Sequence, residues 1–328
     1  MIYPFASIPR AATVVCCAAL AAAAPYAVAQ TYPAKPVRII VSLGPAGGMD
    51  ITSRLLGQKL GERWGQQVVV ENRPGAGGAL GGELVAKAPA DGHTLLTASI
   101  AYAVIPSSHK NLPYDPVHDL APVAVMVNAS NILVVHPSLP VKSVREHIAF
   151  AKAHPGQLSY ASSGNGAAAH LMLEAFKLAT GTDMLHVPYK GTGPGMVDLL
   201  AGRISLTITS IASTMDHVKQ GKLRVLATPG RKRATAAPDV PTIAEAGVPG
   251  YAVDNWYAVF APAATPKEVL AQLNGEVIKI FYAPELKERL ASLGIEPAGE
   301  PLANTNAYIK SEIARWAKVV KAAHISAE

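Results

Sequence analysis

Cysteine is almost absent from this chain of 328 residues, and the only two, Cys16 and Cys17, are adjacent and close to the N-terminus. The rest of the sequence therefore has no thiol for a disulfide, a thiolate metal site or a cysteine nucleophile. Such a chain must be held together by its apolar core. Its length allows this, because about 300 residues are enough for two domains with a core each.

Aromatic and charged residues are also scarce, at 6% and 16%, while hydrophobic residues make up 50% of the chain. This is the composition of an ordinary globular protein. The formal net charge of +6 favours a mild attraction for anions. The single tight basic run, Arg231-Lys232-Arg233, contains no aromatic residue, so we expect no nucleic-acid binding.

The apolar run near the N-terminus is too short for a membrane span. It covers residues 11–24 after Arg10, whereas a bilayer requires about 20 residues. Ala27-Val28-Ala29 then supplies an A-x-A pattern before Gln30. We predict a secretory signal peptide at residues 1–29, cleaved near Ala29-Gln30, which removes both cysteines. The less favoured alternative is a core helix.

Motifs for enzymatic chemistry are missing as well. The histidines are scattered, without H-E-x-x-H, and there is no G-x-S-x-G elbow. Residues 164–169 fit the loose dinucleotide pattern G-x-G-x-x-A, but Asp183 precedes the next predicted strand instead of ending it. We therefore expect no catalytic residues, no metal and no cofactor.

What the sequence does contain is an alternation of strand and helix patterns. Apolar runs predict strands at 37–43, 67–71, 93–98, 132–135, 158–161, 184–187, 204–209, 223–227 and 253–261. Helical spacing predicts helices at 51–64, 77–88, 143–153, 168–179, 195–201, 213–220, 267–282 and 304–323. Such alternation is typical of an α/β protein with parallel sheets covered on both faces.

The first predicted unit has strands but few helices, and the C-terminal tail has helices but few strands. The tail therefore returns to complete the first unit. This gives two α/β domains, 30–130 plus 257–328 and 131–256. Two crossing strands, near 123–131 and 253–261, would join them. A ligand cleft is expected between the domains, at the carboxyl ends of strands.

The most informative feature is the segment 158–180, where an apolar strand runs through small polar residues and glycines into an amphipathic helix. A second junction of this kind lies at 43–50 and a weaker one at 188–195. Backbone N–H groups at such a junction are unpaired, with the positive end of the helix dipole behind them. These junctions therefore predict sites for a small anion.

Eight short motifs in fixed order resemble one known family, the substrate-binding proteins of tripartite tricarboxylate transporters, also called the Bug family. The motifs are Tyr32-Pro33-Ala34-Lys35-Pro36-Val37-Arg38, Gly47-Gly48-Met49-Asp50-Ile51, Val70-Glu71-Asn72-Arg73-Pro74-Gly75-Ala76-Gly77-Gly78, Ala88-Pro89-Ala90-Asp91-Gly92, Ser162-Ser163-Gly164-Asn165-Gly166 with His170, Val187-Pro188-Tyr189-Lys190-Gly191, Pro241-Thr242-Ile243-Ala244-Glu245-Ala246-Gly247, and Trp256 with Phe260-Ala261-Pro262.

The resemblance implies a periplasmic clamshell of the type II binding-protein class, monomeric and without a cofactor. Such proteins capture a small carboxylate and deliver it to membrane permease subunits. Their ligand loops, which bind largely through backbone amides and water, correspond to residues 45–50 and 162–167. Two alternatives stay open: a ligand sensor for a signalling partner and an exported α/β enzyme.

Some positions differ from the family pattern: Ser42-Leu43, Met49, Ala167, Thr207 and Thr209. The two threonines stand where family members often have acidic residues. The changes make the expected pocket less acidic and more apolar. We therefore predict a dicarboxylate with an apolar or aromatic body as the ligand, in preference to an amino acid.

Residues of the two main loops are the first candidates for ligand contact. Hydroxyl and amide donors at a helix start suit a carboxylate without burying a counter-ion. Gly47 and Gly48 allow the backbone to approach a ligand closely. Asp50 fits a helix cap better than a ligand group, because a bare carboxylate repels an anion. His170, one turn inside its helix, is more often structural.

Other candidates follow the third predicted strand or begin the third loop, while Trp256 lies beside the expected hinge. The full set of candidate ligand-binding residues is Gly47, Gly48, Met49, Asp50, Ser99, Tyr102, Ser162, Ser163, Gly164, Asn165, Gly166, His170, Tyr189, Lys190 and Gly191.

Overall fold

The computed structural model describes residues 32–45 and 47–325. The predicted signal peptide and both cysteines lie outside this range. Lys35–Glu328 forms one compact unit, distinct from the segment that ends at Ala34. Within the described part of the chain, no helix is long and apolar enough to cross a membrane.

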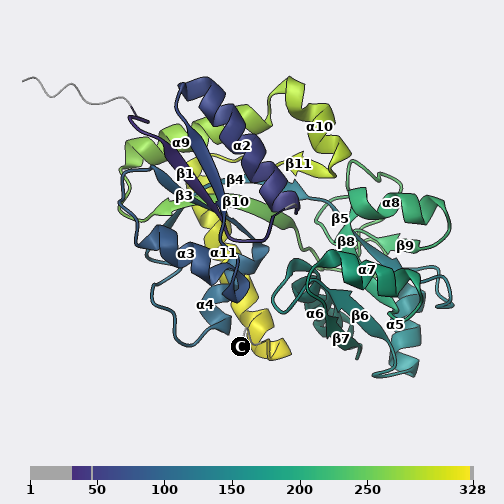
Figure 1. The fold of residues 1–328 in the computed structure, drawn as a ribbon. Coiled ribbons are helices and arrows are strands. Elements are labelled where there is room, and N and C mark those ends of the chain that lie inside the picture. Colours follow the sequence, from purple (N-terminus) through teal and green to yellow (C-terminus); the bar gives the residue numbers. More distant parts are fainter. Residues whose placement is uncertain (1–31, 46, 326–328) are drawn as a thin grey trace, which may run out of the picture. The chain divides into compact units, whose positions relative to one another are not determined.

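A six-stranded mixed sheet, with strand order β11-β4-β10-β3-β1-β2, forms the centre of what we call lobe 1 (Figure 1). Its strands are β1 (Val37–Val41), β2 (Val68–Asn72), β3 (Thr94–Ser99), β4 (Leu120–Ala129), β10 (Asn255–Pro262) and β11 (Ile295–Pro297). Strand β1 is parallel to β2 and β3. Strand β10 is antiparallel to β3 and β4, and β11 is antiparallel to β4.

Helices cover both faces of this sheet. They are α2 (Gly48–Trp64), η1 (Ala76–Gly78), α3 (Ala79–Ala86), η2 (Ile100–Val104), α4 (Ile105–Ser108), α9 (Lys267–Phe281), η3 (Pro284–Leu286), α10 (Lys287–Ser292) and α11 (Leu302–Ala323). Helices α2 and α9 contact each other on one face, while α11 contacts η2 and α4 on the other (Figure 1). Both α9 and α11 also contact β4, so the C-terminal tail does return to the first sheet.

The five-stranded sheet of lobe 2 has the order β7-β6-β8-β5-β9. Its strands are β5 (Asn131–Val135), β6 (Ser159–Ser162), β7 (Leu185–Pro188), β8 (Leu206–Ser210) and β9 (Arg224–Ala227). Its helices are α5 (Val144–Ala153), α6 (Ala168–Thr180), α7 (Thr192–Leu200) and α8 (Ile211–Lys219). Strand β6 is parallel to β7 and β8, whereas β5 is antiparallel to β8 and β9.

The chain crosses between the sheets at two adjacent places. Only Ser130 separates β4 from β5, and β10 begins with Asn255 paired to Ala129. The two predicted crossing strands are therefore confirmed as β4 and β10. The prediction of parallel sheets is confirmed for β1 with β2 and β3 and for β6 with β7 and β8. It is wrong for the crossing strands, because β4 and β10 run antiparallel.

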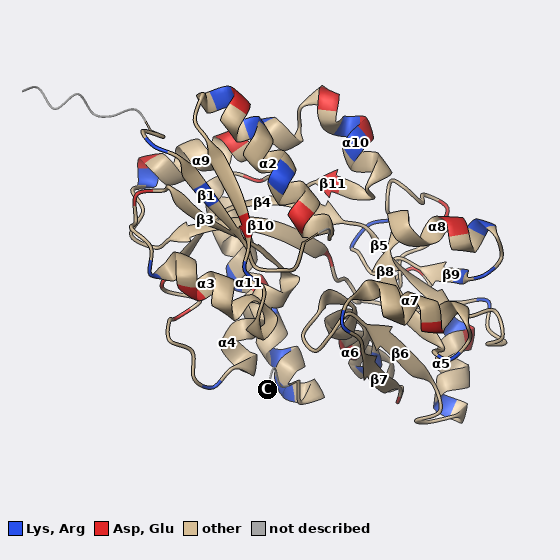
Figure 2. Ribbon diagram, viewed as in Figure 1, with Lys and Arg blue, Asp and Glu red and all other residues tan. Residues whose placement is uncertain are grey.

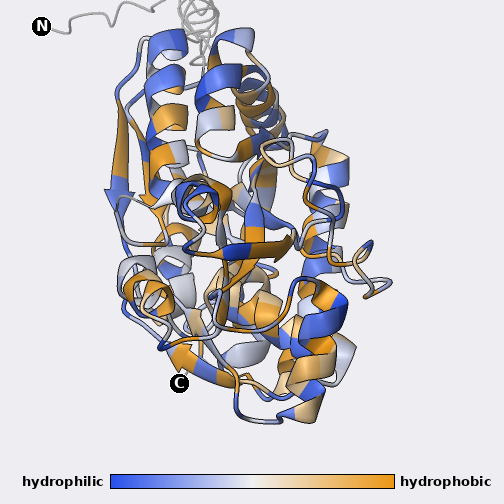
Figure 3. Ribbon diagram, turned by 90° about the vertical axis from the view of Figure 1, so that its right-hand side faces the viewer, coloured by the Kyte–Doolittle hydropathy of each residue, from blue (hydrophilic) through white to orange (hydrophobic). Residues whose placement is uncertain are grey.

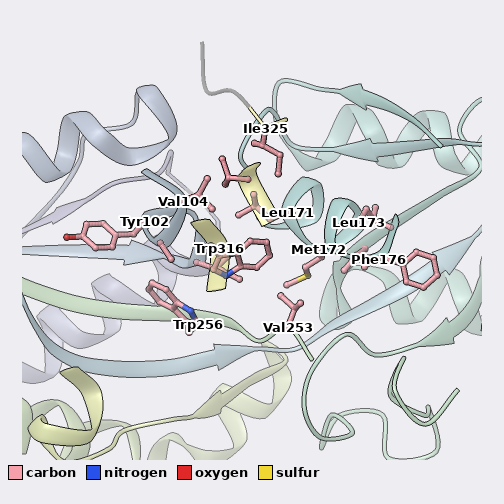
Figure 4. Close-up of a cluster of buried hydrophobic side chains, with 14 of the residues drawn as sticks. Tyr102, Val104, Leu171, Met172, Leu173, Phe176, Val253, Trp256, Trp316 and Ile325 are labelled. Atoms are coloured by element: carbon pink, nitrogen blue, oxygen red, sulfur yellow. The ribbon is translucent and has the colours of Figure 1, made fainter. Parts of the chain in front are cut away.

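Apolar packing continues from one lobe to the other on the side of α11. Figure 4 shows Leu171 and Met172 of α6 close to Trp316 of α11, with Val253 and Trp256 beside them. The helices carry hydrophobic and hydrophilic residues on different sides, as expected of helices that cover a sheet (Figure 3). The crossing strands are thus flanked by a core to which both lobes contribute.

Candidate ligand-binding site

A cavity of about 560 Å³ lies between the two lobes and is lined by residues of both. We call it the binding cavity. The carboxyl ends of β1, β3, β6 and β8 and the N-terminal turns of α2, α6, α7 and α8 contribute to its walls. This is where α/β folds place their ligands, because strand ends and helix starts leave backbone groups unpaired.

The first predicted loop forms one wall, through Gly47, Gly48, Met49 and Asp50. Gly47 is the N-cap residue of α2 and supplies no side-chain cap. The N–H groups of Gly48 and Met49 have no hydrogen bond to any described residue. A Cβ on Gly48 would lie 3.0 Å from the hydroxyl oxygen of Tyr257, so a larger residue here would press on that side chain.

Asp50 lies inside the first turn of α2, so its prediction as a helix cap is wrong, because Gly47 holds that position. The carboxylate accepts hydrogen bonds from Arg54 Nε at 3.1 Å and from Asn72 Nδ2 at 2.9 Å. Asn72 also donates to the carbonyl oxygen of Leu43 at 3.1 Å. Asp50 therefore ties the loop to β2, and the Arg54 guanidinium offsets its charge.

The second predicted loop, residues 162–167, forms part of the opposite wall. Ser163 and Asn165 are exposed, and their side chains make no hydrogen bond to the described residues. The N–H groups of Ala168 and Ala169, at the start of α6, are also without a partner among these residues. The loop thus offers neutral donors to the cavity with the positive end of the α6 dipole behind them.

Ser162 also lines the cavity, but its hydroxyl is used inside the protein. It donates to the carbonyl oxygen of Gly164 at 3.0 Å and lies 2.6 Å from His186 Nε2. His170 is buried and does not line the cavity. Its Nδ1 accepts the N–H of Gly166 at 3.0 Å.

Four other predicted residues lie elsewhere in the structure. Tyr102 is buried, donates to the carbonyl of Pro116 and packs on Phe260. Tyr189 donates to Asp198 Oδ2 at 2.7 Å, Lys190 is exposed, and Gly191 is the N-cap residue of α7. None of the four lines the binding cavity, whereas the predicted Ser99 does.

Several lining residues were missed by the sequence reasoning. They are Asn131 and Asn255 at the crossings, Tyr257 on β10, Thr192 and Met196 on α7, and Ser210 and Ser213 at α8. The polar residues Thr209 and Ser210 join a strand to a helix, and this pattern could have predicted the lining residues at the start of α8. Nothing local marks the residues at the crossings, because only the tertiary fold brings them to the cavity.

Charge is nearly absent from this cavity. Among the described residues that line it, Asp50 is the one charged side chain, and it is paired with Arg54. Figure 2 shows Lys, Arg, Asp and Glu mainly on outer helices and loops. Leu43, Met49 and Met196 add apolar surface. The cavity can therefore hold an anion through hydroxyl, amide and backbone donors.

Two lobes around a cavity of this kind define a solute-binding protein of the two-domain α/β class. The family model described as "Tripartite tricarboxylate transporter family receptor" matches residues 52–325, and the chain belongs to this family. The resemblance inferred from the motifs is confirmed. The family consists of substrate-binding receptors, so the expectation that the chain is not an enzyme is confirmed as well.

Individual relatives agree with this assignment. Protein BugT of Bordetella pertussis is 39% identical over 295 residues, which cover 89% of this chain and 90% of BugT. The structure titled "R. palustris Rpa4515 with adipate" has a TM-score of 0.79 and 37% identity, and covers 90% of this chain and 99% of that one. The structure of MatC from Rhodopseudomonas palustris with bound malate has a TM-score of 0.76 and 29% identity. The match covers 88% of this chain and 100% of that one.

Proposed function

We propose that this protein captures a small carboxylate in the binding cavity and delivers it to the membrane permease subunits of a tripartite tricarboxylate-type transporter. The observation that carries the proposal is a set of backbone N–H groups at the starts of α2 and α6, on opposite walls of one cavity, that have no partner among the described residues. Helix starts of this kind attract anions. The similar structures with adipate and malate support a carboxylate as that anion.

The lining favours a dicarboxylate with an apolar or aromatic body. An ammonium group would need an acidic partner, but Thr207 and Thr209 are neutral and Asp50 is already paired with Arg54. Leu43, Met49, Ile51, Met196, Leu293 and Ile295 supply the apolar surface. Such a lining disfavours amino acids, because an unpaired ammonium group would lose its hydration without a replacement.

Closure of the two lobes is the proposed step of capture. A dianion that contacts the 47–50 loop with one carboxylate and the 162–167 loop with the other would bridge the lobes. It would therefore bind the closed state more tightly than the open one and shift the population toward closure. The permease would then recognise the closed surface.

The proposed place of action is the periplasm, since receptors of this family are periplasmic. The predicted signal peptide at residues 1–29 would direct export. A mature chain that starts at Gln30 would contain no cysteine.

Calorimetric titration of this mature chain, stripped of ligand, tests the proposal. The panel contains adipate, malate, citrate, benzoate and glutamate. We expect saturable micromolar binding of a dicarboxylate. Glutamate should bind at least tenfold more weakly, a difference in binding free energy of about 1.4 kcal/mol. No binding of any carboxylate would contradict the proposal.

A pair of variants tests whether the ligand binds at the 162–167 loop. Ser163→Asp puts a negative charge on the exposed donor loop and should abolish carboxylate binding by repulsion. Ser311→Asp makes the same change on the exposed surface of α11 and should leave the affinity unchanged. Equal affinity of both variants would contradict this location of the site.

A further inference from the structure

Three aromatic rings from separate elements stack directly behind the 162–167 loop. The ring of His186 on β7 lies between those of Tyr160 on β6 and His170 on α6. Its centroid is 4.8 Å from that of Tyr160, at an interplanar angle of 17°, and 4.0 Å from that of His170, at 7°. Neither imidazole lines the binding cavity. The stack is therefore placed to support the loop rather than to touch a ligand.

Each imidazole contacts one end of the loop. His186 Nε2 lies 2.6 Å from the hydroxyl oxygen of Ser162, where β6 ends. His170 Nδ1 accepts the N–H of Gly166 at 3.0 Å, just before α6 begins. Gly166 has a φ of 71°, in the left-handed region that favours glycine. The two contacts thus fix the loop at both sides of its exposed residues.

Other bonds also hold the ends of this loop, since the N–H of Tyr189 donates to the carbonyl of Ser162 at 2.9 Å and the N–H of Gly164 donates to the Ser162 hydroxyl at 3.2 Å. The N–H of Ala167 donates to the carbonyl of Gly164 at 3.2 Å, and the N–H of Gly191 reaches the carbonyl of Ser163 at a long 3.4 Å. Loss of the His170 contact would release the N–H of Gly166 and loosen the turn that leads into α6, where the N–H groups of Ala168 and Ala169 have no partner among the described residues. Such groups bind an anion well only when they are held in the required direction.

The acceptor role of His170 requires a neutral ring, because protonated Nδ1 would point an N–H at the N–H of Gly166. Burial lowers the pKa of His170, and it lowers the pKa of His186 to about 4. The other ionisable groups that face the two rings are Tyr160 on β6 and Glu174 and Lys177 on α6. Both rings are thus neutral at pH 7.

We propose that His170 and His186 are positioning residues, which hold the 162–167 loop in its ligand-binding geometry from behind without touching the ligand. The inference rests on the proposed function, because it assigns these residues to the carboxylate site. It also makes binding sensitive to acid, since a proton on His170 removes the acceptor for Gly166.

The test compares two substitutions of His170 with a control. His170→Phe keeps a flat ring in the stack but removes the acceptor, whereas His170→Asn keeps an acceptor near the position of Nδ1 and cannot titrate. The exposed His118→Phe is the control, since among the described residues the His118 side chain is hydrogen-bonded only to Asp115, three residues earlier. Each variant is titrated with adipate from pH 4 to pH 8. Amide hydrogen exchange of the loop is measured without ligand, and melting temperature confirms folding.

We expect His170→Phe to weaken adipate binding about tenfold at pH 7 and to speed amide exchange at Gly166 by a similar factor. Loss of one hydrogen bond has an effect of this size. His170→Asn should stay within about threefold of the wild type at pH 7 and lose less affinity toward pH 4. His118→Phe should change neither quantity.

Unchanged loop exchange in folded His170→Phe, or a wild-type pH profile in His170→Asn, would overturn the inference. If the wild-type protein binds no carboxylate, the proposed function fails, and the inference falls as an account of ligand binding. Loop exchange would then still show whether His170 holds the loop.

Discussion

At the scale of single residues, some contacts in the wall of the binding cavity leave little room for additional atoms. Gly48 is the sharpest case, because it begins α2 and faces the Tyr257 hydroxyl of β10. Backbone at this point can approach a ligand only as long as no side chain intervenes.

The substitution Gly48→Ala should weaken ligand binding about tenfold with little loss of fold stability. The new Cβ would lie 3.0 Å from the Tyr257 hydroxyl, so this side chain, which lines the cavity, would have to shift by a few tenths of an ångström. Calorimetry with adipate and urea denaturation measure the two effects. The control is Gly275→Ala in α9, where nothing lies within 4 Å of the new Cβ. It should keep the affinity and stabilise the helix by up to about 1 kcal/mol.

His147 on α5 should make the fold sensitive to acid. It is fully buried, and neither ring nitrogen has a hydrogen-bond partner within the described chain. Burial lowers its pKa to about 4, so the unfolded chain takes up the proton first as pH falls. Stability should therefore fall between about pH 6.5 and pH 4, by roughly 3 kcal/mol in total.

Urea denaturation at pH 7 and pH 4.5 measures this loss, and His147→Met, which cannot be protonated, should reduce it. The pKa of His186 is also lowered to about 4, so part of the loss of stability at low pH should remain in this variant. An equal loss in both proteins would show that His147 does not contribute.

At the scale of elements, the sequence predicted the strands and helices with strong periodicity to within a few residues. Helix α6 is one example, predicted at 168–179 and found at Ala168–Thr180. The helical segment Ile100–Val104 with α4 was missed, because its residues are almost all apolar and show no period. Strand direction was also missed, since alternation of strands and helices does not encode which strands return antiparallel.

The same limit applies to the candidate site. The loops at 47–50 and 162–167 could be predicted, because glycines and small polar residues mark a strand-to-helix junction. Tyr189 was predicted from a similar pattern, yet its hydroxyl is bonded to Asp198 and it does not line the cavity. Contacts between distant elements, such as Tyr257 with Gly48, depend on how the strands pair and have no local signal.

One buried carboxylate links α11 to β10. The side chain of Glu312 is 1% exposed. It accepts hydrogen bonds from Trp256 Nε1 at 3.2 Å, Trp316 Nε1 at 3.4 Å and Arg315 at 3.2 Å. Glu312→Ala should destabilise the fold by about 3 kcal/mol, because two buried indole N–H groups lose their acceptor. Glu312→Gln keeps an acceptor and should cost less. Urea denaturation compares them, and equal losses would contradict this role.

At the scale of the whole molecule, the crossing strands separate two cavities. The second cavity, of about 430 Å³, is also lined by both lobes and shares Ala129, Asn131 and Asn255 with the binding cavity. A rotation of the lobes about the crossings would therefore change the widths of both cavities. Contacts between the lobes at the second cavity favour the open state of the binding cavity if closure breaks them.

Glu296 on β11 makes such a contact. Its Oε1 accepts the N–H of Thr235 at 2.8 Å and the hydroxyl of Ser130 at 3.3 Å. Glu296→Ala should favour closure and tighten adipate binding by up to about tenfold, the scale of one hydrogen bond to a charged group. Calorimetry gives the affinity, and small-angle scattering of the ligand-free protein shows whether it becomes more compact.

Glu300 provides the matched control, since it lines the same cavity but, among the described residues, its side chain is hydrogen-bonded only to Asn304 of its own lobe. Glu300→Ala removes the same charge without removing a contact between the lobes, so its affinity should equal that of the wild type. Tighter binding in both variants would assign the effect to charge alone. Tighter binding in Glu296→Ala alone would assign it to the bond with Thr235, and weaker binding there would mean that this bond stabilises the closed state instead.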